Sequence, residues 1–298
     1  MDIIRIVLEL LYWNFGGKMG KKITITGAGG YIGRHVVNAF LNKNIPVTAV
    51  DINTNFIDNR ASIVECNIFE DKGDIYKKIN EPEICLHLAW QDGFNHNAQS
   101  HIMNIPKHYT FINNMIENGL KQIVVLGTMH EVGYWEGAID ENTPTNPISF
   151  YGIGKNTVRQ IVQEISKKKG VIFQWLRAFY ILGDDLQNRS IFTRILEMEK
   201  EGKPTFPFTT GENKYDFIDI DILANQIVAS VMQTEVTGII NCCTGNPISL
   251  KEKVEQFIFE KNLKIKPEYG VYPSRPYDSP AIWGDPTKIT QILKNYNP

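Results

Sequence analysis

The chain has 298 residues, of which 43% are hydrophobic and 21% charged, so it can bury a substantial core and is not a disordered protein. Its length fits one large α/β unit or a main domain with a smaller appendage. The 31 basic and 33 acidic residues give a net charge of -2, which is too balanced for a dedicated nucleic-acid or membrane-surface binder.

The first 18 residues precede the part of the chain that has the pattern of a folded domain. A membrane span needs roughly 18 to 20 apolar residues, and the closest stretch, residues 3–15, is interrupted by Arg5 and Glu9. The stretch also lacks the uncharged core and the small-residue cleavage site of a signal peptide. We interpret residues 1–18 as an N-terminal extension or an alternative start, with an amphipathic helix that docks on a partner as the alternative.

Short apolar runs alternate with helical periods along the first part of the chain, which is typical of a parallel sheet with crossover helices. Helical spacing is clearest from Ile32 to Phe40 and from Val158 to Ile165. We predict the α/β class, with a Rossmann-type doubly wound parallel sheet whose ligand site lies at the carboxyl ends of the strands. The predicted strands are residues 22–26, 47–50, 63–66, 84–88, 123–126 and 171–176.

Beyond Gly183 the pattern changes. Residues 191–201 predict a helix and residues 239–243 a late strand, while five prolines fall between residues 267 and 286. This spacing of prolines and short elements is typical of a loop-rich lobe that closes over a substrate. We assign residues 19–183 with 216–245 to the Rossmann domain, and residues 184–215 with 246–298 to a smaller C-terminal substrate-binding lobe.

The four cysteines carry no metal-binding or disulfide pattern. They show neither a C-x-x-C pair nor a metal-ligand spacing, and two of them are adjacent. Such cysteines are typical of small buried side chains in a reducing compartment. We therefore expect no metal site, no disulfide and a cytoplasmic protein; the cysteines are Cys66, Cys85, Cys242 and Cys243.

A glycine-rich turn follows the first predicted strand. Gly27, Gly30 and Gly33 form the spacing G-x-x-G-x-x-G ahead of an amphipathic helix. Glycines allow a tight turn and a close approach to a pyrophosphate, whose charge then meets amide donors at the helix N-terminus. Asp51 ends the next strand, 24 residues after Gly27, where a carboxylate accepts hydrogen bonds from a ribose diol and repels a 2′-phosphate. Because no arginine immediately follows Asp51, the pattern predicts NAD(H) rather than NADP(H).

Tyr151 and Lys155 lie four residues apart and therefore share one face of a predicted helix. A free tyrosine, with a pKa near ~10, is a poor acid or base at neutral pH. A nearby ammonium group favours the phenolate and brings the pKa of Tyr151 closer to the working range. Thr128 follows the buried-type strand 123–126, where its hydroxyl is placed to hydrogen-bond a substrate oxygen; a strand-end cap is the alternative interpretation.

Together these features resemble an extended short-chain dehydrogenase/reductase of the NAD-dependent epimerase/dehydratase type, over essentially all of residues 21–298. The resemblance implies Tyr151 as general acid/base, Lys155 as the residue that holds the nicotinamide ribose, and Thr128 as the group that polarises the reacting carbonyl or hydroxyl. It also implies a nucleotide-diphosphate sugar as substrate. Further matching residues are Leu86-His87-Leu88-Ala89, Asn104, Leu176-Arg177 with Gly183, and Asp216-Phe217-Ile218.

The same resemblance implies a set of contacts with the cofactor from the glycine turn, the ends of the strands and the catalytic helix. His87, by contrast, lies within a strand pattern, and we interpret it as a core histidine. The implied cofactor-binding residues are Gly27, Gly30, Tyr31, Ile32, Gly33, Asp51, Ile52, Asn67, Ile68, Leu88, Ala89, Asn104, Tyr151 and Lys155.

The residues after Thr128 discriminate between reactions of the family. The 4,6-dehydratases resemble one another in a Thr-Asp-Glu run, whereas Met129 and His130 stand here. The related decarboxylases carry glutamate at the position of His130, and the epimerase-reductases of fucose nucleotides carry cysteine at that of Met129. The run 127–133 is similar to the Gly-Thr-x-x-Glu-Tyr-Gly of deoxysugar-nucleotide 4-ketoreductases, with Val132 in place of the tyrosine.

We therefore expect an NAD(H)-dependent oxidoreductase that acts at C4 of a nucleotide-diphosphate deoxysugar. Phe179-Tyr180 favours the same choice, since many epimerases have asparagine at the second position. A nucleotide-sugar 4-epimerase is the first alternative, and a non-catalytic NAD(P)-binding regulatory protein is the second. Relatives often dimerise through two helices per subunit, so we expect a homodimer, with no nucleic-acid or membrane partner.

Substrate contacts are expected from Thr128, His130, Tyr180, Lys214 and Arg275. The family usually places an arginine directly before the Asp-Phe of its late motif, where it grips the diphosphate, and this chain has Lys214-Tyr215 before Asp216-Phe217. Lys214 supplies charge without the planar fork of a guanidinium. Arg275 is therefore the leading candidate for the diphosphate contact. For His130, a loop histidine that caps backbone carbonyls is the alternative interpretation.

Overall fold

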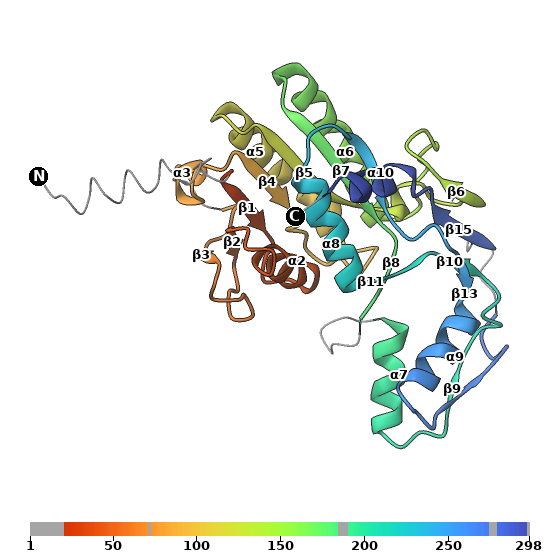
Figure 1. Cartoon of the computed structure of the whole chain (residues 1–298). Helices are drawn as coiled ribbons and strands as arrows, with labels where there is room; N and C mark the ends of the chain where they lie inside the picture. The colour runs from red at the N-terminus through yellow and green to blue at the C-terminus, as the bar shows by residue number, and fades with distance from the viewer. Residues whose placement is uncertain (1–20, 71–72, 184–189, 274–278, 297–298) are drawn as a thin grey trace, which may run out of the picture.

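The computed structural model describes residues 21–70, 73–183, 190–273 and 279–296. Its larger part is a seven-stranded sheet in which all neighbouring strands are parallel (Figure 1). The strand order is β12-β7-β5-β4-β1-β2-β3, which confirms the predicted doubly wound sheet. The strands are β1 (Ile23–Thr26), β2 (Thr48–Asp51), β3 (Ser62–Glu65), β4 (Ile84–His87), β5 (Gln122–Thr128), β7 (Ile172–Ala178) and β12 (Gly238–Cys242).

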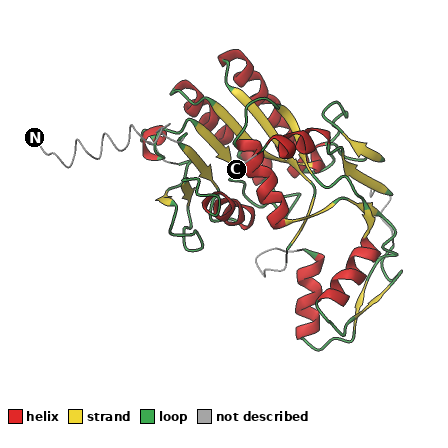
Figure 2. Ribbon diagram, in the orientation of Figure 1, coloured by secondary structure: helices red, strands yellow, loops and turns green. Residues whose placement is uncertain are grey.

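Helices cover both faces of this sheet (Figure 2). Because successive side chains of a strand point to opposite faces, Val124 and Leu126 of β5 join one hydrophobic cluster while Ile123 and Val125 join the other. The first cluster includes α2 (Tyr31–Leu41), α8 (Ile220–Val231) and α10 (Thr287–Asn295), and the second includes α3 (Ile75–Lys78), α5 (Ile105–Glu117) and α6 (Phe150–Lys169). The short helix α4 (Ser100–Met103) precedes α5 and packs on α6.

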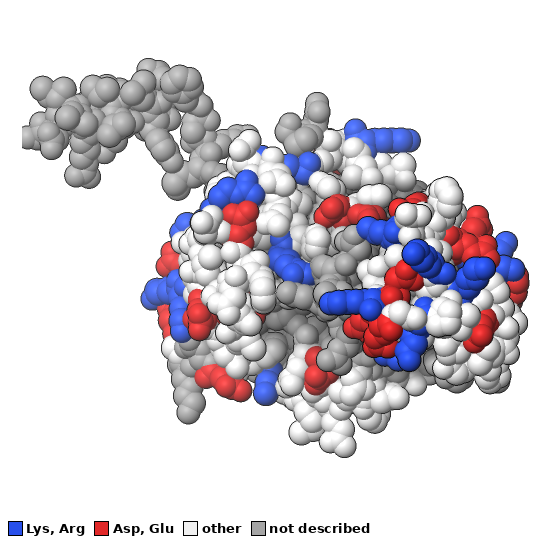
Figure 3. All heavy atoms as spheres, turned by 90° about the horizontal axis from the view of Figure 1, so that it is seen from below, with Lys and Arg blue, Asp and Glu red and all other residues white. Residues whose placement is uncertain are grey.

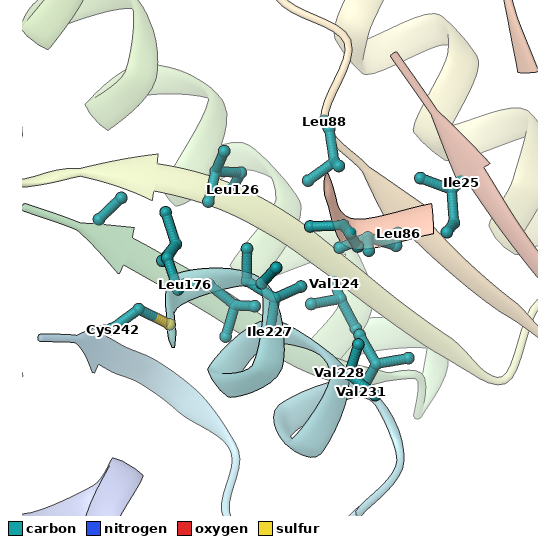
Figure 4. Packing of buried hydrophobic residues seen from close by; sticks show 14 of the residues in the cluster. Ile25, Leu86, Leu88, Val124, Leu126, Leu176, Ile227, Val228, Val231 and Cys242 are labelled. Atoms are coloured by element: carbon teal, nitrogen blue, oxygen red, sulfur yellow. The ribbon is translucent and has the colours of Figure 1, made fainter. Parts of the chain in front are cut away.

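The packing of α8 on the sheet shows how the first cluster is built (Figure 4). Ile227, Val228 and Val231 point from the helix toward Val124 and Leu176 of the central strands, and all five side chains are buried. Burial of each such side chain contributes roughly 1.5–3 kcal/mol to the free energy of unfolding. All four cysteines are buried as well.

Helix α6 carries the predicted Tyr-Lys pair and has a clear signal at each end. Ser149 caps its start, because the Ser149 hydroxyl oxygen accepts a hydrogen bond from the Gly152 amide at 3.2 Å. Gly170, with φ of 67°, ends it in the left-handed conformation that glycine adopts without strain. Tyr151 therefore stands in the first turn of the helix, at the carboxyl edge of the sheet.

A smaller lobe lies beside the carboxyl ends of the strands and has its own apolar cluster, which includes Phe192, Phe206, Val254 and Ile265 (Figure 1). It contains α7 (Ile191–Lys200), β9 (Thr205–Pro207), α9 (Leu250–Glu260) and β14 (Lys266–Glu268). A four-stranded sheet, in the order β13-β10-β15-β6, adjoins it. Its strands are β13 (Ile248–Ser249), β10 (Lys214–Tyr215), β15 (Ala281–Gly284) and β6 (Gly137–Ile139), and β8 (Tyr180–Leu182) pairs with β11 (Phe217–Asp219).

Two elements cross the domain boundaries expected from the sequence. Helix α10, expected in the lobe, packs on α8 and β12, and its Ile289 and Ile292 belong to the core of the large sheet. Strand β6, expected in the Rossmann domain, pairs with β15. In both cases long-range packing of a short apolar segment decides its location, which local sequence does not reveal.

Candidate active site

The glycine turn packs so tightly that side chains do not fit. Gly27 has φ of +72°, and a Cβ atom on it would stand 2.5 Å from the amide nitrogen of Ala89. A Cβ on Gly33 would stand 2.1 Å from the carbonyl oxygen of Gly27. The N-terminus of α2 is thereby drawn against the end of β1, as close approach of a backbone to pyrophosphate requires.

Two adjoining cavities open at the carboxyl ends of β1 and β4, with volumes of about 520 and 420 Å³. This is the switch point of the strand order, because β4 and β2 lie on opposite sides of β1. Both cavities are lined by Gly27, Gly30, Leu88 and Trp90. The first also contains Tyr31, Ile32, Gly33, Tyr151 and Lys155, and the second Asp51, Ile52, Asn67, Ile68 and Ala89.

These cavities bring together every sequence-predicted cofactor residue except Asn104. The Asn104 side chain is buried and donates from Nδ2 to Oε1 of Gln91 at 3.1 Å, and Gln91 lines the second cavity. Asn104 therefore contacts a residue of the cavity lining but does not line the cavity itself.

The residues present fit a nicotinamide dinucleotide. Glycines of the turn line the shared part of the two cavities, and the Asp51 carboxylate stands at the end of β2 in the second. Its two oxygens accept hydrogen bonds from the amides of Gly29 and Asn53, at 2.9 and 3.1 Å. These bonds hold the carboxylate where a ribose diol would meet it, and its charge opposes a 2′-phosphate.

Lys155 is turned toward the sheet. Its side chain is buried, and Nζ donates to the carbonyl oxygen of Leu126 at 2.7 Å and stands 3.9 Å from the centre of the Trp90 ring. Burial lowers the pKa of Lys155 to about 7. The ammonium group is 6.0 Å from the centre of the Tyr151 ring.

The pKa of Tyr151 departs from the sequence-based expectation. Burial raises it to about 12, the negative charge of Glu131 adds to this rise, and hydrogen bonding to the Thr128 side chain opposes it. The pKa of Tyr151 therefore lies above its ordinary value in the free protein, not closer to the working range as expected from Lys155. Desolvation of the phenolate outweighs the favourable interactions, so Tyr151 is a neutral phenol at pH 7.

Aromatic rings pack around and beyond Tyr151. His96 stacks on Tyr151 with ring centres 4.8 Å apart, and His130 meets His96 edge-on at 4.5 Å. His130 also lies 6.5 Å from Tyr180, which packs on Tyr215 at 4.3 Å. Burial lowers the pKa of His130 to about 4, so its ring is neutral at pH 7 and carries one donor and one acceptor.

Of the two residues expected to contact the diphosphate, Lys214 and Arg275, only Lys214 is among the described residues. Tyr215 occupies the position before Asp216 and packs against Tyr180, so the alternation of the strand directs the exposed Lys214 to the opposite face, away from that ring. The expectation of Lys214 as a substrate contact is not supported by this orientation. Arg275 lies outside the described residues.

Sequence reasoning missed Trp90 and His96. Trp90 directly follows Leu88-Ala89 at the carboxyl edge of the sheet, and this position in the sequence indicates a residue of the site. Its indole Nε1 donates to Nδ1 of His101 at 3.0 Å. His96 had no local signal, because a loop carries it. His87 is a core histidine as expected, hydrogen-bonded to Thr26 and His108.

Across the described ranges, no helix is long and apolar enough to cross a bilayer, and no group of three or more His, Cys, Asp or Glu residues is arranged to hold a metal ion. On the face shown in Figure 3, acidic and basic side chains are interspersed.

Comparisons with known proteins identify the family of this chain. The NAD dependent epimerase/dehydratase family matches residues 23–243, and the chain belongs to this family. A relative from Aggregatibacter actinomycetemcomitans, dTDP-6-deoxy-L-talose 4-dehydrogenase (NAD(+)), is 48% identical over 88% of this chain and 98% of its own length. The predicted family, enzyme class and NAD cofactor are confirmed.

Solved structures share the fold. The UDP-N-acetylglucosamine 4-epimerase of Methanobrevibacter ruminantium M1 superposes with a TM-score of 0.80 at 19% identity, covering 93% of each chain. The UDP-glucose 4-epimerase of Thermus thermophilus, in complex with NAD, superposes with a TM-score of 0.77 at 17% identity, covering 91% of this chain and 92% of its own.

Proposed function

We propose that this protein is an NAD(H)-dependent oxidoreductase that interconverts a hydroxyl and a ketone at C4 of a dTDP-6-deoxyhexose. The observation that carries the proposal is the 48% identity to a dTDP-6-deoxy-L-talose 4-dehydrogenase over 98% of that relative's length. The site supports it, because Tyr151 and Lys155 line the same cavity as the glycine turn.

In this proposal the bound nicotinamide supplies or accepts the hydride, and the protein handles the proton. During reduction the neutral Tyr151 phenol donates its proton to the C4 oxygen and becomes a phenolate. In oxidation the phenolate form of Tyr151 accepts the proton of the C4 hydroxyl. Thr128 hydrogen-bonds the same oxygen. Lys155 holds the cofactor ribose from within the cavity, and the glycine turn and Asp51 hold the pyrophosphate and the second ribose.

The substrate contacts proposed for this reaction are Thr128, His130, Tyr180 and Arg275. His130 offers a neutral donor and acceptor between Tyr151 and Tyr180. Neighbouring rings of Tyr180 and Tyr215 supply an apolar surface suited to a deoxysugar. Tyr215 takes the place of the family arginine, so we assign the diphosphate to Arg275.

A redox assay separates this activity from the alternatives. With dTDP-6-deoxy-L-talose and NAD⁺, a dehydrogenase forms one NADH per sugar oxidised, whereas a 4-epimerase leaves the total of reduced cofactor unchanged. Stoichiometric NADH formation, followed at the reduced-nicotinamide absorbance band, is the expected result. Product analysis that shows a C4 epimer without NADH establishes the epimerase instead.

Tyr151→Phe separates catalysis from simple cofactor binding. We expect turnover to fall by about 10²- to 10⁴-fold while NAD⁺ affinity stays within about twofold, because the phenol proton is lost and the ring is kept. Wild-type turnover in this variant excludes the acid/base role. Affinity for NAD⁺ with no turnover in the parent protein supports the regulatory alternative.

We also propose a homodimer formed through α5 and α6. Tyr109 on α5, and Phe150 and Ile153 on α6, are large apolar side chains with 43%, 43% and 38% exposure. Light scattering tests this assembly. The buried cysteines are consistent with a reducing compartment, for which we propose the cytoplasm.

A further inference from the structure

The turn after Thr128 is built around a buried carboxylate. Glu131 ends the short 3-10 helix η1 (Met129–Glu131) and has 0% exposure. One of its oxygens, Oε1, accepts hydrogen bonds from the Thr128 amide at 2.7 Å and from the Trp175 indole at 2.8 Å. The Thr128 hydroxyl oxygen accepts in turn from the His130 amide at 3.3 Å. This capping box fixes the Thr128 side chain and leaves its hydroxyl proton available to another acceptor.

The second oxygen of Glu131 joins the turn to two other elements. Oε2 lies 3.6 Å from Nη2 of Arg177 on β7 and 3.7 Å from Nε of Arg159 on α6. Arg159 follows Lys155 by four residues and Tyr151 by eight, so the three residues lie on one side of the helix. A single carboxylate thus connects Thr128 with the helix of Tyr151 and Lys155.

The packing around this carboxylate leaves little freedom. A Cβ atom on Gly127 would stand 2.0 Å from the indole nitrogen of Trp175 and 2.7 Å from Oε1 of Glu131. The carboxylate therefore rests against the last residues of β5, and a shift of Glu131 moves Thr128 with it.

The charge of Glu131 also acts on both titrating residues of the site. It raises the pKa of Tyr151 in addition to burial, and it raises that of Lys155 against the larger lowering by burial. The other titratable groups around Tyr151 are Lys155 on its own helix and three imidazoles on neighbouring elements. Those imidazoles belong to His96, His101 and His130.

We propose that Glu131 is a positioning residue of this reaction, which holds the Thr128 hydroxyl at a fixed place relative to the Tyr151 helix and sets the charge environment of that helix. The inference rests on the proposed function of the same site. Glu131 does not line the cavity, so this role is indirect. An ordinary helix cap is exposed and has no arginine partners, whereas Glu131 is buried and lies beside two arginines.

Glu131→Gln is the main test, because it keeps the shape and the acceptor oxygen but removes the charge. We expect the pH-independent maximum of kcat for NAD⁺-linked oxidation to fall about tenfold or more, with KM for NAD⁺ within about twofold. Loss of a negative charge lowers the pKa of Tyr151, so the midpoint of the rise of kcat with pH moves down by about half a pH unit or more.

Arg159→Gln is the complementary variant and keeps the buried Glu131–Arg177 pair. Removal of a positive charge raises the pKa of Tyr151 and Lys155, so the same midpoint moves to higher pH. Because this variant leaves one carboxylate facing one guanidinium, it tests the proposal even if Glu131→Gln does not fold. The control is Glu117→Gln, which removes the exposed partner of Lys169 and is expected to leave kcat and the pH profile unchanged.

An NMR titration of the Lys155 side chain gives a readout without turnover. We expect its midpoint to fall in Glu131→Gln and to rise in Arg159→Gln. The inference is overturned if the folded variants keep the parent kcat and pH profile, or if both shift in the same direction. Absence of NAD-linked turnover in the parent protein overturns the proposed function instead, whereas unchanged variants of an active parent overturn only the role of Glu131.

Discussion

The two sides of the candidate active site are built in different ways. On the cofactor side, glycines of one turn line the two cavities, and two main-chain amides hold the Asp51 carboxylate. The proposed substrate side consists of packed rings from four separate segments, which carry His96, His130, Tyr180 and Tyr215. The tight turn has no room for added side-chain atoms at Gly27 or Gly33, whereas each ring residue on the other side can be replaced singly.

The two sides therefore depend on the sequence in different ways. The contacts with the dinucleotide depend on a strand, a tight turn and a helix, so they persist wherever that local structure persists. Contacts on the proposed substrate side depend on the identity of single side chains in loops and short strands. Variants in the two halves should therefore differ in which ligand they affect.

The largest effect is expected from Gly33→Ala on the cofactor side. The new Cβ would stand 2.1 Å from the Gly27 carbonyl oxygen, so α2 has to move away from the turn. We expect NAD⁺ affinity to fall about 100-fold and the free energy of unfolding to fall by about 1–3 kcal/mol. Calorimetry and urea unfolding measure the two quantities. Gly93→Ala is the matched control, since Gly93 lines the same cavity and its Cβ would meet nothing within 4 Å. Equal affinities in the two variants contradict the tight-turn explanation.

Acid should destabilise the protein through two desolvated histidines, His87 in the core and His130 beside Tyr151. Burial lowers the pKa of His87 to about 3 and that of His130 to about 4, whereas the unfolded chain keeps the ordinary value of 6.5. Between these values the unfolded state binds more protons, so the free energy of unfolding falls as pH falls from about 6.5 to about 4. The slope is at most about 1.4 kcal/mol per pH unit for each histidine.

Urea unfolding at several pH values measures this slope. We expect His87→Gln and His130→Gln each to reduce it, with the larger reduction for His87 because its folded-state pKa is lower. An unchanged slope in both variants shows that other groups govern the acid sensitivity.

A moderate effect is expected from Asp51→Asn. Loss of the negative charge weakens the hydrogen bonds to a ribose diol and removes the repulsion of a 2′-phosphate. We expect NAD⁺ affinity to fall about tenfold and the preference over NADP⁺ to shrink by at least the same factor. Dissociation constants for NAD⁺ and NADP⁺ measure this preference. An unchanged ratio between them shows that another residue sets the preference.

The smallest effect is expected at Lys214. Its side chain is exposed on the face opposite Tyr215, so Lys214→Ala should change KM for the sugar nucleotide by less than about twofold. Tyr215→Ala, which opens the ring contact with Tyr180, should raise KM by about three- to tenfold. Steady-state kinetics compares the neighbours directly. A larger effect from Lys214 restores it as a substrate contact.

The sequence by itself determined the large sheet, the glycine turn and the family. Apolar runs, helices with period 3.6 and glycines at fixed offsets are local signals, and each of the seven predicted strands is present within one or two residues of its expected ends. Most of the cofactor site follows from these signals, because its residues lie just after strands β1, β2, β3 and β4 or in the first turns of α6.

Only the tertiary structure decided the rest. Trp90 and His96 become part of the site because loops pack against α6, and α10 joins the large core through contacts with α8. The pKa values of Tyr151 and Lys155 depend on burial by every surrounding element and on the charge of Glu131, not on their spacing along one helix. Desolvation is a property of the whole packed environment, which a four-residue interval in the sequence does not contain.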